Sequence, residues 1–517
     1  MGYFFEDRQG KPLLLTGLQC HNSSTGSPLL EKAIRAVKAF HGNLLEAPVY
    51  WNWLEPTPGV YDLSHVRALI RTAKEAGLYL VILWFAANKN GHPSYAPEYL
   101  KLDPDTYRLA VKPDGLPVPS LSPHCQATLQ ADRRAFTALM RCIKEENETG
   151  GTVLAVQVEN EPGLGGTDRD YSPEAQADFE KGVPPALSGI EIPGSAASLR
   201  DDSWHGRFGV WANEAFTAWY QARYIQEIAA AGKQICDLPL LVNAMLGHPY
   251  AEGGLEYNAG GPTVRVLDIW KRAAPAIDLL CPDNYMAARD HYNHFCEAYA
   301  REDNPLFIPE SSFRGPAAAL NVIRAAAGYE AAGICCFGAE STLDADGSIR
   351  EDVADTAVSF RMIRAVAPLL LAHHGTGRIH AILQEEFMDR QLLQLPGYRI
   401  TARFDDHRGV QKAGDQLPRG RGILIRTGET EFFLTGDNVA LDFAACPGPE
   451  ESMRRFRLKA RQSGQLNFLS VEEGHFEGDR WVVDFCRNGD ESNFELYARK
   501  GEVVRLRLNP MTCAKGK

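Results

Sequence analysis

Two glutamates that follow apolar segments are the residues best placed to do chemistry. Glu161 comes after the β-branched run at 153–158 and directly before Pro162-Gly163, and Glu310 comes after Phe307-Ile308-Pro309. Such apolar runs predict buried parallel strands, and parallel barrels carry their active sites at the carboxyl ends of the strands. A protonated carboxyl group and an ionised carboxylate on opposite sides of one sugar ring are what hydrolysis of a glycosidic bond requires. Either glutamate alone could be an ordinary strand-end acid, but two in barrel register favour a catalytic pair.

Eight apolar segments predict the strands that would position this pair. They cover residues 13–20, 43–51, 78–85, 153–161, 239–243, 277–285, 305–311 and 333–340, and the longer stretches between them read mostly as helices. Regular alternation of this kind predicts parallel β/α units, and eight of them close a (β/α)8 barrel. The helix expected over 352–371 would be the last of the barrel, which we assign to residues 1–374.

The pattern of apolar and polar residues changes near residue 376. Short alternating runs such as Gly422–Arg426 and Trp481–Phe485 recur between turns rich in Gly, Asp and Asn. This pattern predicts a β-sandwich, which we assign to residues 375–517. Its expected role is to pack against the barrel; glycan binding is the alternative.

Composition excludes several classes of protein. The chain has 517 residues, of which 44% are hydrophobic and 23% charged, enough for two or three globular domains. A net charge of -12 argues against a nucleic-acid groove and against binding to anionic membranes. Eleven cysteines without a C-x-x-C pair, and a start at Met1–Arg8 that lacks a basic then apolar stretch, predict a cytoplasmic protein without disulfides. The histidines lack metal-binding spacing, so we expect neither a metal nor a cofactor.

Several motifs give the chain a family resemblance. Asn160-Glu161-Pro162 resembles the acid/base motif of the retaining glycoside hydrolases of clan A. Within that clan, other segments resemble β-galactosidases of glycoside hydrolase family 35, with family 42 as a neighbour. These segments are Tyr50–Pro56 with Gly59–Asp62, His21–Ser24, Leu83–Gly91 and Ser94–Glu98. Bacterial members of that branch often carry a β-rich C-terminal domain of undefined role, which the region after Thr376 resembles.

The resemblance implies catalytic roles for four residues. Glu161 would be the general acid and then the general base, and Glu310 the nucleophile that forms a covalent glycosyl-enzyme. Asn160 would bind the 2-hydroxyl of the sugar. Tyr285 would donate its phenol proton to Glu310 and hold it ionised, although it could also be a packing residue.

Other residues are candidates for substrate binding. Tyr50 and Asn88 fall where members of the family bind galactose hydroxyls, and Trp84 could stack under the sugar or pack in the core. Trp204, His205 and Phe208, in or just after the long insertion at 162–207, could line further subsites. Glu159 is expected to point to the helical layer and pair with a base.

The sequence therefore predicts a retaining exo-β-galactosidase that acts on terminal β-galactose of oligosaccharides by double displacement. The alternatives are another clan A exo-β-glycosidase, acting on glucose, fucose or arabinopyranose, and a carbohydrate-binding barrel without activity. The expected partners are the β-galactoside substrate and a second copy of the chain in a homo-oligomer.

Overall fold

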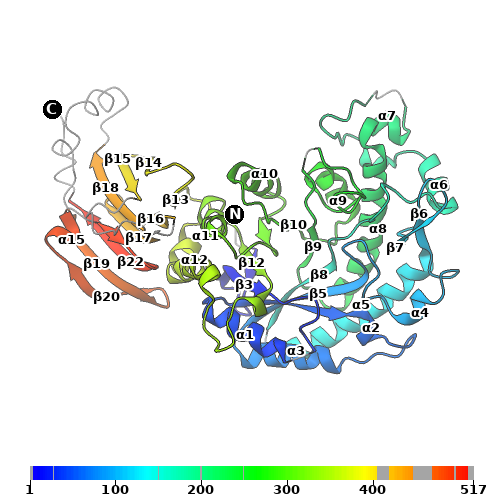
Figure 1. The fold of residues 1–517 in the computed structure, drawn as a ribbon, viewed down its shortest axis with the longest axis horizontal. Helices are drawn as coiled ribbons and strands as arrows, with labels where there is room; N and C mark the ends of the chain where they lie inside the picture. Colours follow the sequence, from blue (N-terminus) through cyan, green and yellow to red (C-terminus); the bar gives the residue numbers. More distant parts are fainter. Residues whose placement is uncertain are drawn as a thin grey trace.

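In the computed structural model, a ring of eight parallel strands forms the centre of the larger, N-terminal part of the chain (Figure 1). The structure describes residues 4–26, 28–148, 151–197, 201–248, 250–404, 419–445, 468–493 and 496–509. The strands are β3 (Leu15–Gln19), β4 (Leu44–Tyr50), β5 (Tyr79–Lys89), β8 (Val153–Asn160), β9 (Leu240–Ala244), β10 (Leu279–Pro282), β11 (Phe307–Ile308) and β12 (Gly333–Phe337). The predicted (β/α)8 barrel is confirmed.

The ring closes at the end where the two glutamates lie. Hydrogen-bonded neighbours follow the order β10-β9-β8-β5-β4-β3-β12-β11, so that β10 and β11 form the two edges. A single parallel bridge between Asp283 and Glu310 joins these edges just beyond their carboxyl ends. The closure of the barrel is therefore also a contact between two carboxyl-bearing residues.

Side chains alternate between the barrel interior and the surrounding helices, as the pleat of a strand requires. On β5, Val81, Leu83 and Phe85 belong to the interior cluster, whereas Ile82 and Trp84 pack with the helices. The helices of this outer layer are α1 (Leu29–Ala39), α3 (Ser64–Glu75), α5 (Gln126–Asn147), α8 (Ala212–Ile235), α9 (Leu267–Ala273), α10 (Arg289–Tyr299), α11 (Pro316–Ile323), α12 (Ala354–Ala365) and α13 (Ala367–His373). Within the described ranges, no helix combines the length and apolarity needed to cross a membrane.

Two loops on the catalytic side carry structure that the sequence did not predict. A hairpin of β6 (Leu109–Val111) and β7 (Pro117–Leu121) lies in the long connection between β5 and α5. The connection after β8 contains α6 (Pro173–Glu180) and α7 (Trp204–Phe208). Pro at the first turn and a Ser172 side chain that accepts a hydrogen bond from Ala175 N explain why α6 begins where it does.

The C-terminal region folds into two antiparallel sheets, as predicted. The larger sheet has the order β13-β16-β17-β22-β19-β20 and the smaller the order β14-β15-β18-β21. Side chains of β15, β16, β17, β18 and β22 fill the space between the two sheets. The strands are β13 (Ile379–Leu383), β14 (Arg390–Leu395), β15 (Tyr398–Arg403), β16 (Arg421–Arg426), β17 (Glu431–Asp437), β18 (Val439–Ala445), β19 (Phe468–Glu477), β20 (Arg480–Arg487), β21 (Tyr497–Ala498) and β22 (Glu502–Leu508).

The central strands of the larger sheet, β16, β17 and β22, are largely buried on both faces because their outer face packs against the barrel helix α12 (Figure 1). On β16, Leu424 points into the sandwich, while Ile423 and Ile425 join the core around the barrel. Arg421 at the start of β16 is buried at this junction. Its guanidinium donates to Ser359 Oγ and to the carbonyl of Asp355, each at 2.8 Å.

We predict that Arg421→Met destabilises the protein by about 3 kcal/mol, because it leaves buried acceptors on α12 without donors. Thermal and denaturant unfolding would measure this loss. Arg419→Met is the matched control, since Arg419 makes an exposed ion pair with Glu386 at 3.0 Å and should change stability by roughly 0.5 kcal/mol or less. Equal effects of the two substitutions would contradict the structural role given to Arg421.

Candidate active site

Glu310 lies at the barrel mouth between two hydrogen-bond donors. The Nε2 of Gln19, at the end of β3, donates to Oε1 at 2.9 Å, and the hydroxyl of Tyr285 donates to Oε2 at 2.8 Å. Glu310 is 6% exposed, whereas Tyr285 is 43% exposed. Both oxygens of this carboxyl group therefore accept a hydrogen bond. The structure thus has the contact between Tyr285 and Glu310 that the family resemblance implied.

Glu161 is held by its backbone rather than by donors to its carboxyl group. Its N–H donates to Asn243 Oδ1 at 2.8 Å, and its carbonyl accepts from Asn258 Nδ2 at 2.7 Å. Its φ of 44° lies in the left-handed region that residues other than glycine rarely adopt. The side chain is 7% exposed and its carboxyl group lies in contact with that of Asp283.

The two glutamates have opposite electrostatic surroundings. Burial, and then the charge of Glu310, raise the pKa of Glu161 to about 7, although Lys89 at the end of β5 acts in the opposite direction. Burial and the charge of Glu310 also raise the pKa of the Tyr285 phenol, so it stays a donor. The arrangement therefore presents one carboxyl group that keeps its proton near neutral pH beside one whose two oxygens each accept a hydrogen bond, an asymmetry suited to an acid and a nucleophile.

Asn160 is the next site residue predicted from the sequence, and it lies directly before Glu161. It is buried; its Nδ2 donates to Asn90 Oδ1 at 2.9 Å, and its Oδ1 accepts from Gln157 at 3.1 Å. These amides lock the loop after β5 to the end of β8. A contact of Asn160 with a sugar hydroxyl stays a prediction.

Three of the predicted substrate-binding residues are buried. The indole of Trp84 is fully buried among the helices and donates to Asp132 Oδ1 on α5 at 2.9 Å, so the prediction that it stacks on a sugar is wrong. Asn88 gives and receives hydrogen bonds with the backbone of Leu121, which ties β7 to β5. Tyr50 is 1% exposed, belongs to the interior cluster of the barrel and stacks on Tyr95 at 5.1 Å between ring centroids. A contact of its hydroxyl with a sugar stays a prediction.

Glu159 points toward the helical layer, but its partner is an acid rather than the expected base. Its carboxyl group accepts from the backbone N–H of Ala87 and of Asn88 at 3.1 and 3.2 Å and lies against Asp132. Burial, and then the charge of Asp132, raise its pKa well above the usual value. Two buried carboxyl groups in contact are stable only when they hold a proton between them.

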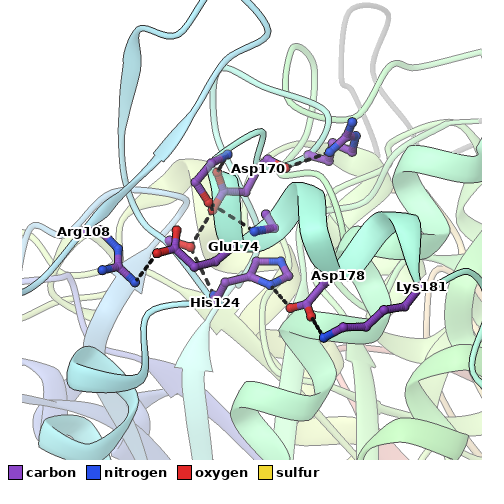
Figure 2. Close-up of polar contacts among 10 residues, drawn as sticks. Arg108, His124, Asp170, Glu174, Asp178 and Lys181 are labelled. Carbon is purple, nitrogen blue, oxygen red and sulfur yellow. Dashed lines mark hydrogen bonds and ion pairs between the residues drawn. The ribbon is translucent and has the colours of Figure 1, made fainter.

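The insertion after β8 is a packed and hydrogen-bonded unit (Figure 2). The buried carboxylate of Asp170 accepts from Ser122 Oγ at 2.5 Å and from Val111 N at 3.0 Å, and His124 contacts Asp178 at 2.9 Å. Trp204 and Phe208 are buried in the aromatic cluster with Phe179 and Phe216, so they cannot line a sugar subsite.

A cavity of about 320 Å³ lies against the loops that hold Glu161. Its lining includes Asn90, which contacts Asn160, and Asn258, which holds the Glu161 carbonyl. Gly165, Leu255 and Tyr257 complete much of its wall. A larger cavity of about 710 Å³ lies at the opposite end of the barrel, before β3 and β5, and so is remote from both glutamates.

Several residues of the site were missed in the sequence. Gln19, Asn243 and Asp283 are polar residues at or just beyond the ends of predicted strands, the same signal that singled out Glu161 and Glu310. Glu46 is buried inside the barrel on β4, where burial and then the charge of Glu310 raise its pKa well above the usual value. Among the residues that the structure describes, no group of three His, Cys, Asp or Glu side chains could hold a metal ion.

Comparisons with known proteins agree with this fold. Residues 25–232 match the family described as "Beta-galactosidase" (Glyco_hydro_42), and residues 356–499 match "Domain of unknown function (DUF5597)". A β-galactosidase from Xanthomonas manihotis is 26% identical over 185 residues, which are 34% of this chain and only 28% of that protein.

Solved structures give a more distant likeness. The β-galactosidase from Bacillus circulans sp. alkalophilus has a TM-score of 0.50 at 13% identity, over 70% of this chain and 57% of that chain. The β-galactosidase from Rahnella sp. R3 has a TM-score of 0.49 at 15% identity, over 71% and 58%. The matching family is family 42, and the resemblance to family 35 stays a prediction. The first part of the chain is therefore similar to the family 42 β-galactosidases, and the solved structure shares its barrel fold.

Proposed function

We propose that the protein is a retaining exo-β-galactosidase of the family 35 type that releases terminal β-galactose from oligosaccharides. The observation that carries the proposal is that two carboxyl groups at one barrel mouth have different hydrogen-bonding surroundings. Glu310 accepts hydrogen bonds from Gln19 and Tyr285, while Glu161 has a pKa raised to about 7. The β-galactosidase names of the matching family and relatives support galactose as the sugar.

In the first step, the ionised Glu310 attacks the anomeric carbon as the bond to the leaving oxygen breaks. Glu161 gives its proton to that oxygen, so that an alcohol leaves rather than an alkoxide. Tyr285 and Gln19 hold Glu310 in place for this attack. The cavity of about 320 Å³ beside the Glu161 loops would give the leaving part of the substrate room.

In the second step, the ionised Glu161 takes a proton from water, whose oxygen displaces Glu310 from the anomeric carbon. Two inversions give net retention. The division at residues 374 and 375, the cytoplasmic location and the homo-oligomer remain predictions from the sequence.

A panel of 4-nitrophenyl β-glycosides tests the activity. We predict that the galactoside has the highest kcat/KM and that NMR of the early product shows β-galactose before mutarotation. If the α-anomer appears first, the mechanism is inverting. Faster turnover of the glucoside, fucoside or arabinopyranoside would make the enzyme a different exo-glycosidase, and no turnover of any member would end the proposal.

Tyr285→Phe tests the hydrogen bond to Glu310. Loss of a donor to a charged group costs about 1.5–3 kcal/mol, so we predict a fall in kcat of about 10- to 100-fold with little change in fold. Tyr329→Phe is a matched control, because Tyr329 donates to Glu297 at 3.1 Å away from the barrel mouth. An unchanged kcat in Tyr285→Phe would show that Glu310 does not depend on this hydrogen bond.

Burial of the acid should make stability depend on pH. The folded pKa of Glu161 is about 7 and its usual value 4.5, so folding binds a proton between these values and the free energy of unfolding falls as pH rises. The stabilisation is complete below pH 4.5 and lost above pH 7, a change of about 3 kcal/mol.

We predict that Glu161→Gln raises the thermal midpoint at pH 8 and has little effect at pH 5, measured by calorimetry. Glu174→Gln on the exposed helix α6 should show neither change. A Glu161→Gln protein that is no more stable at pH 8 would contradict the buried, proton-binding state of Glu161.

A further inference from the structure

Asp283 is a third carboxyl group at the mouth, and the proposed mechanism gives it no role. It follows β10 directly and forms the bridge to Glu310 that closes the barrel. It is 3% exposed and its carboxyl group lies in contact with that of Glu161. A buried carboxyl group beside two others requires a reason to be there.

Asn243 connects Asp283 to Glu161. Its Nδ2 donates to Asp283 Oδ2 at 2.7 Å, and its Oδ1 accepts from the backbone N–H of Glu161 at 2.8 Å. This occupies one oxygen of Asp283. The other, Oδ1, is buried and has no hydrogen-bond donor within the described part of the chain. The group in contact with Asp283 that can supply a proton to it is the carboxyl group of Glu161.

We propose that Asp283 is a positioning residue for Glu161, and that the two carboxyl groups hold one proton between them. The shared proton fixes the Glu161 side chain and is the proton that passes to the leaving oxygen. This inference rests on the proposed function of Glu161 as the acid.

Charge is conserved in this arrangement. Before the first step Glu310 carries one negative charge and the pair carries another. As the glycosyl bond to Glu310 forms, that charge disappears, and the pair becomes doubly negative when it releases its proton to the leaving oxygen. In the second step water returns a proton to the pair, and Glu310 regains its charge as its bond to the sugar breaks. The total charge of the three groups is the same throughout.

Other groups around the pair set the background of its titration. Two carboxyl groups, those of Glu310 and Glu46, oppose ionisation of the pair by their charge, and Lys89 favours ionisation of Glu161. The groups that face Glu161 or Asp283 are Glu310, Glu46, Tyr285, Lys89, Cys281 and Tyr299. Because they stay in place when Asp283 alone is changed, the effect of Asp283 can be isolated.

The first experiment is the pH profile of kcat/KM for 4-nitrophenyl β-galactoside. Asp283→Asn keeps the acceptor for Asn243 but cannot share a proton between two carboxyl groups, so we expect the alkaline limb to fall by about one pH unit or more. If the asparagine variant folds poorly, Asp283→Ser takes its place, and we expect its alkaline limb to fall by a smaller amount. Asp278→Asn is the control, since Asp278 pairs with Lys233 at 2.7 Å at the far end of the same strand and should leave the limb unchanged. A limb that stays in place while kcat falls would overturn the proposal.

The second experiment does not depend on activity. Infrared difference spectra in D2O, taken between the protein and its Glu161→Gln variant, follow the carboxylic-acid carbonyl band of the pair with pH. The same difference is then taken in the Asp283→Asn background. We expect the band to disappear at a lower pH, by about one unit, without Asp283. Equal midpoints would overturn the shared proton, whereas a shifted midpoint in a protein that hydrolyses no glycoside would support the pair and refute the proposed function instead.

Discussion

Mutual repulsion among buried carboxyl groups governs the mouth of this barrel. Burial, and then the charge of Glu310, raise the pKa of Glu46, of Glu161 and of Asp283. Lys89 is the cation that acts on Glu161. Rigid strands prevent the groups from separating, so the site must retain protons instead. A carboxyl group that keeps a proton at neutral pH is the component that acid catalysis needs.

The backbone that carries the acid is strained, and hydrogen bonds from neighbouring residues hold it in this conformation. Glu159 and Glu161 both have positive φ, of 64° and 44°, which costs about 1–3 kcal/mol per residue. Asn243 and Asn258 each hold one side of the Glu161 peptide, and the Glu159 carboxyl group is bonded to the backbone of β5. The same turn ends β8 and breaks the alternation of its side chains. The orientation of the acid is therefore imposed by its surroundings, not by local preference.

The sequence predicted the elements and the two strand-end glutamates because apolar runs and their polar ends are local features. The direction of Trp84 was not predictable in this way, since it depends on which residue of β5 begins the inward alternation. The hydrogen bonds of Asn88 were not predictable for another reason, because its partner Leu121 lies on a separate hairpin. Gln19, Asn243 and Asp283 carried the right signal, but their convergence is visible only once eight strands close into one ring.

The C-terminal sandwich reaches the catalytic strands through α12. Arg421 donates to Ser359 Oγ, whose hydroxyl in turn donates to the carbonyl of Ala319 on α11. One turn earlier on α12, Thr356 Oγ1 donates to the carbonyl of Phe313, three residues beyond Glu310. Each bond is short and buried, and together they tie the loop after Glu310 to a helix that the sandwich covers. Through these bonds the sandwich supports the segment that carries Glu310 from behind.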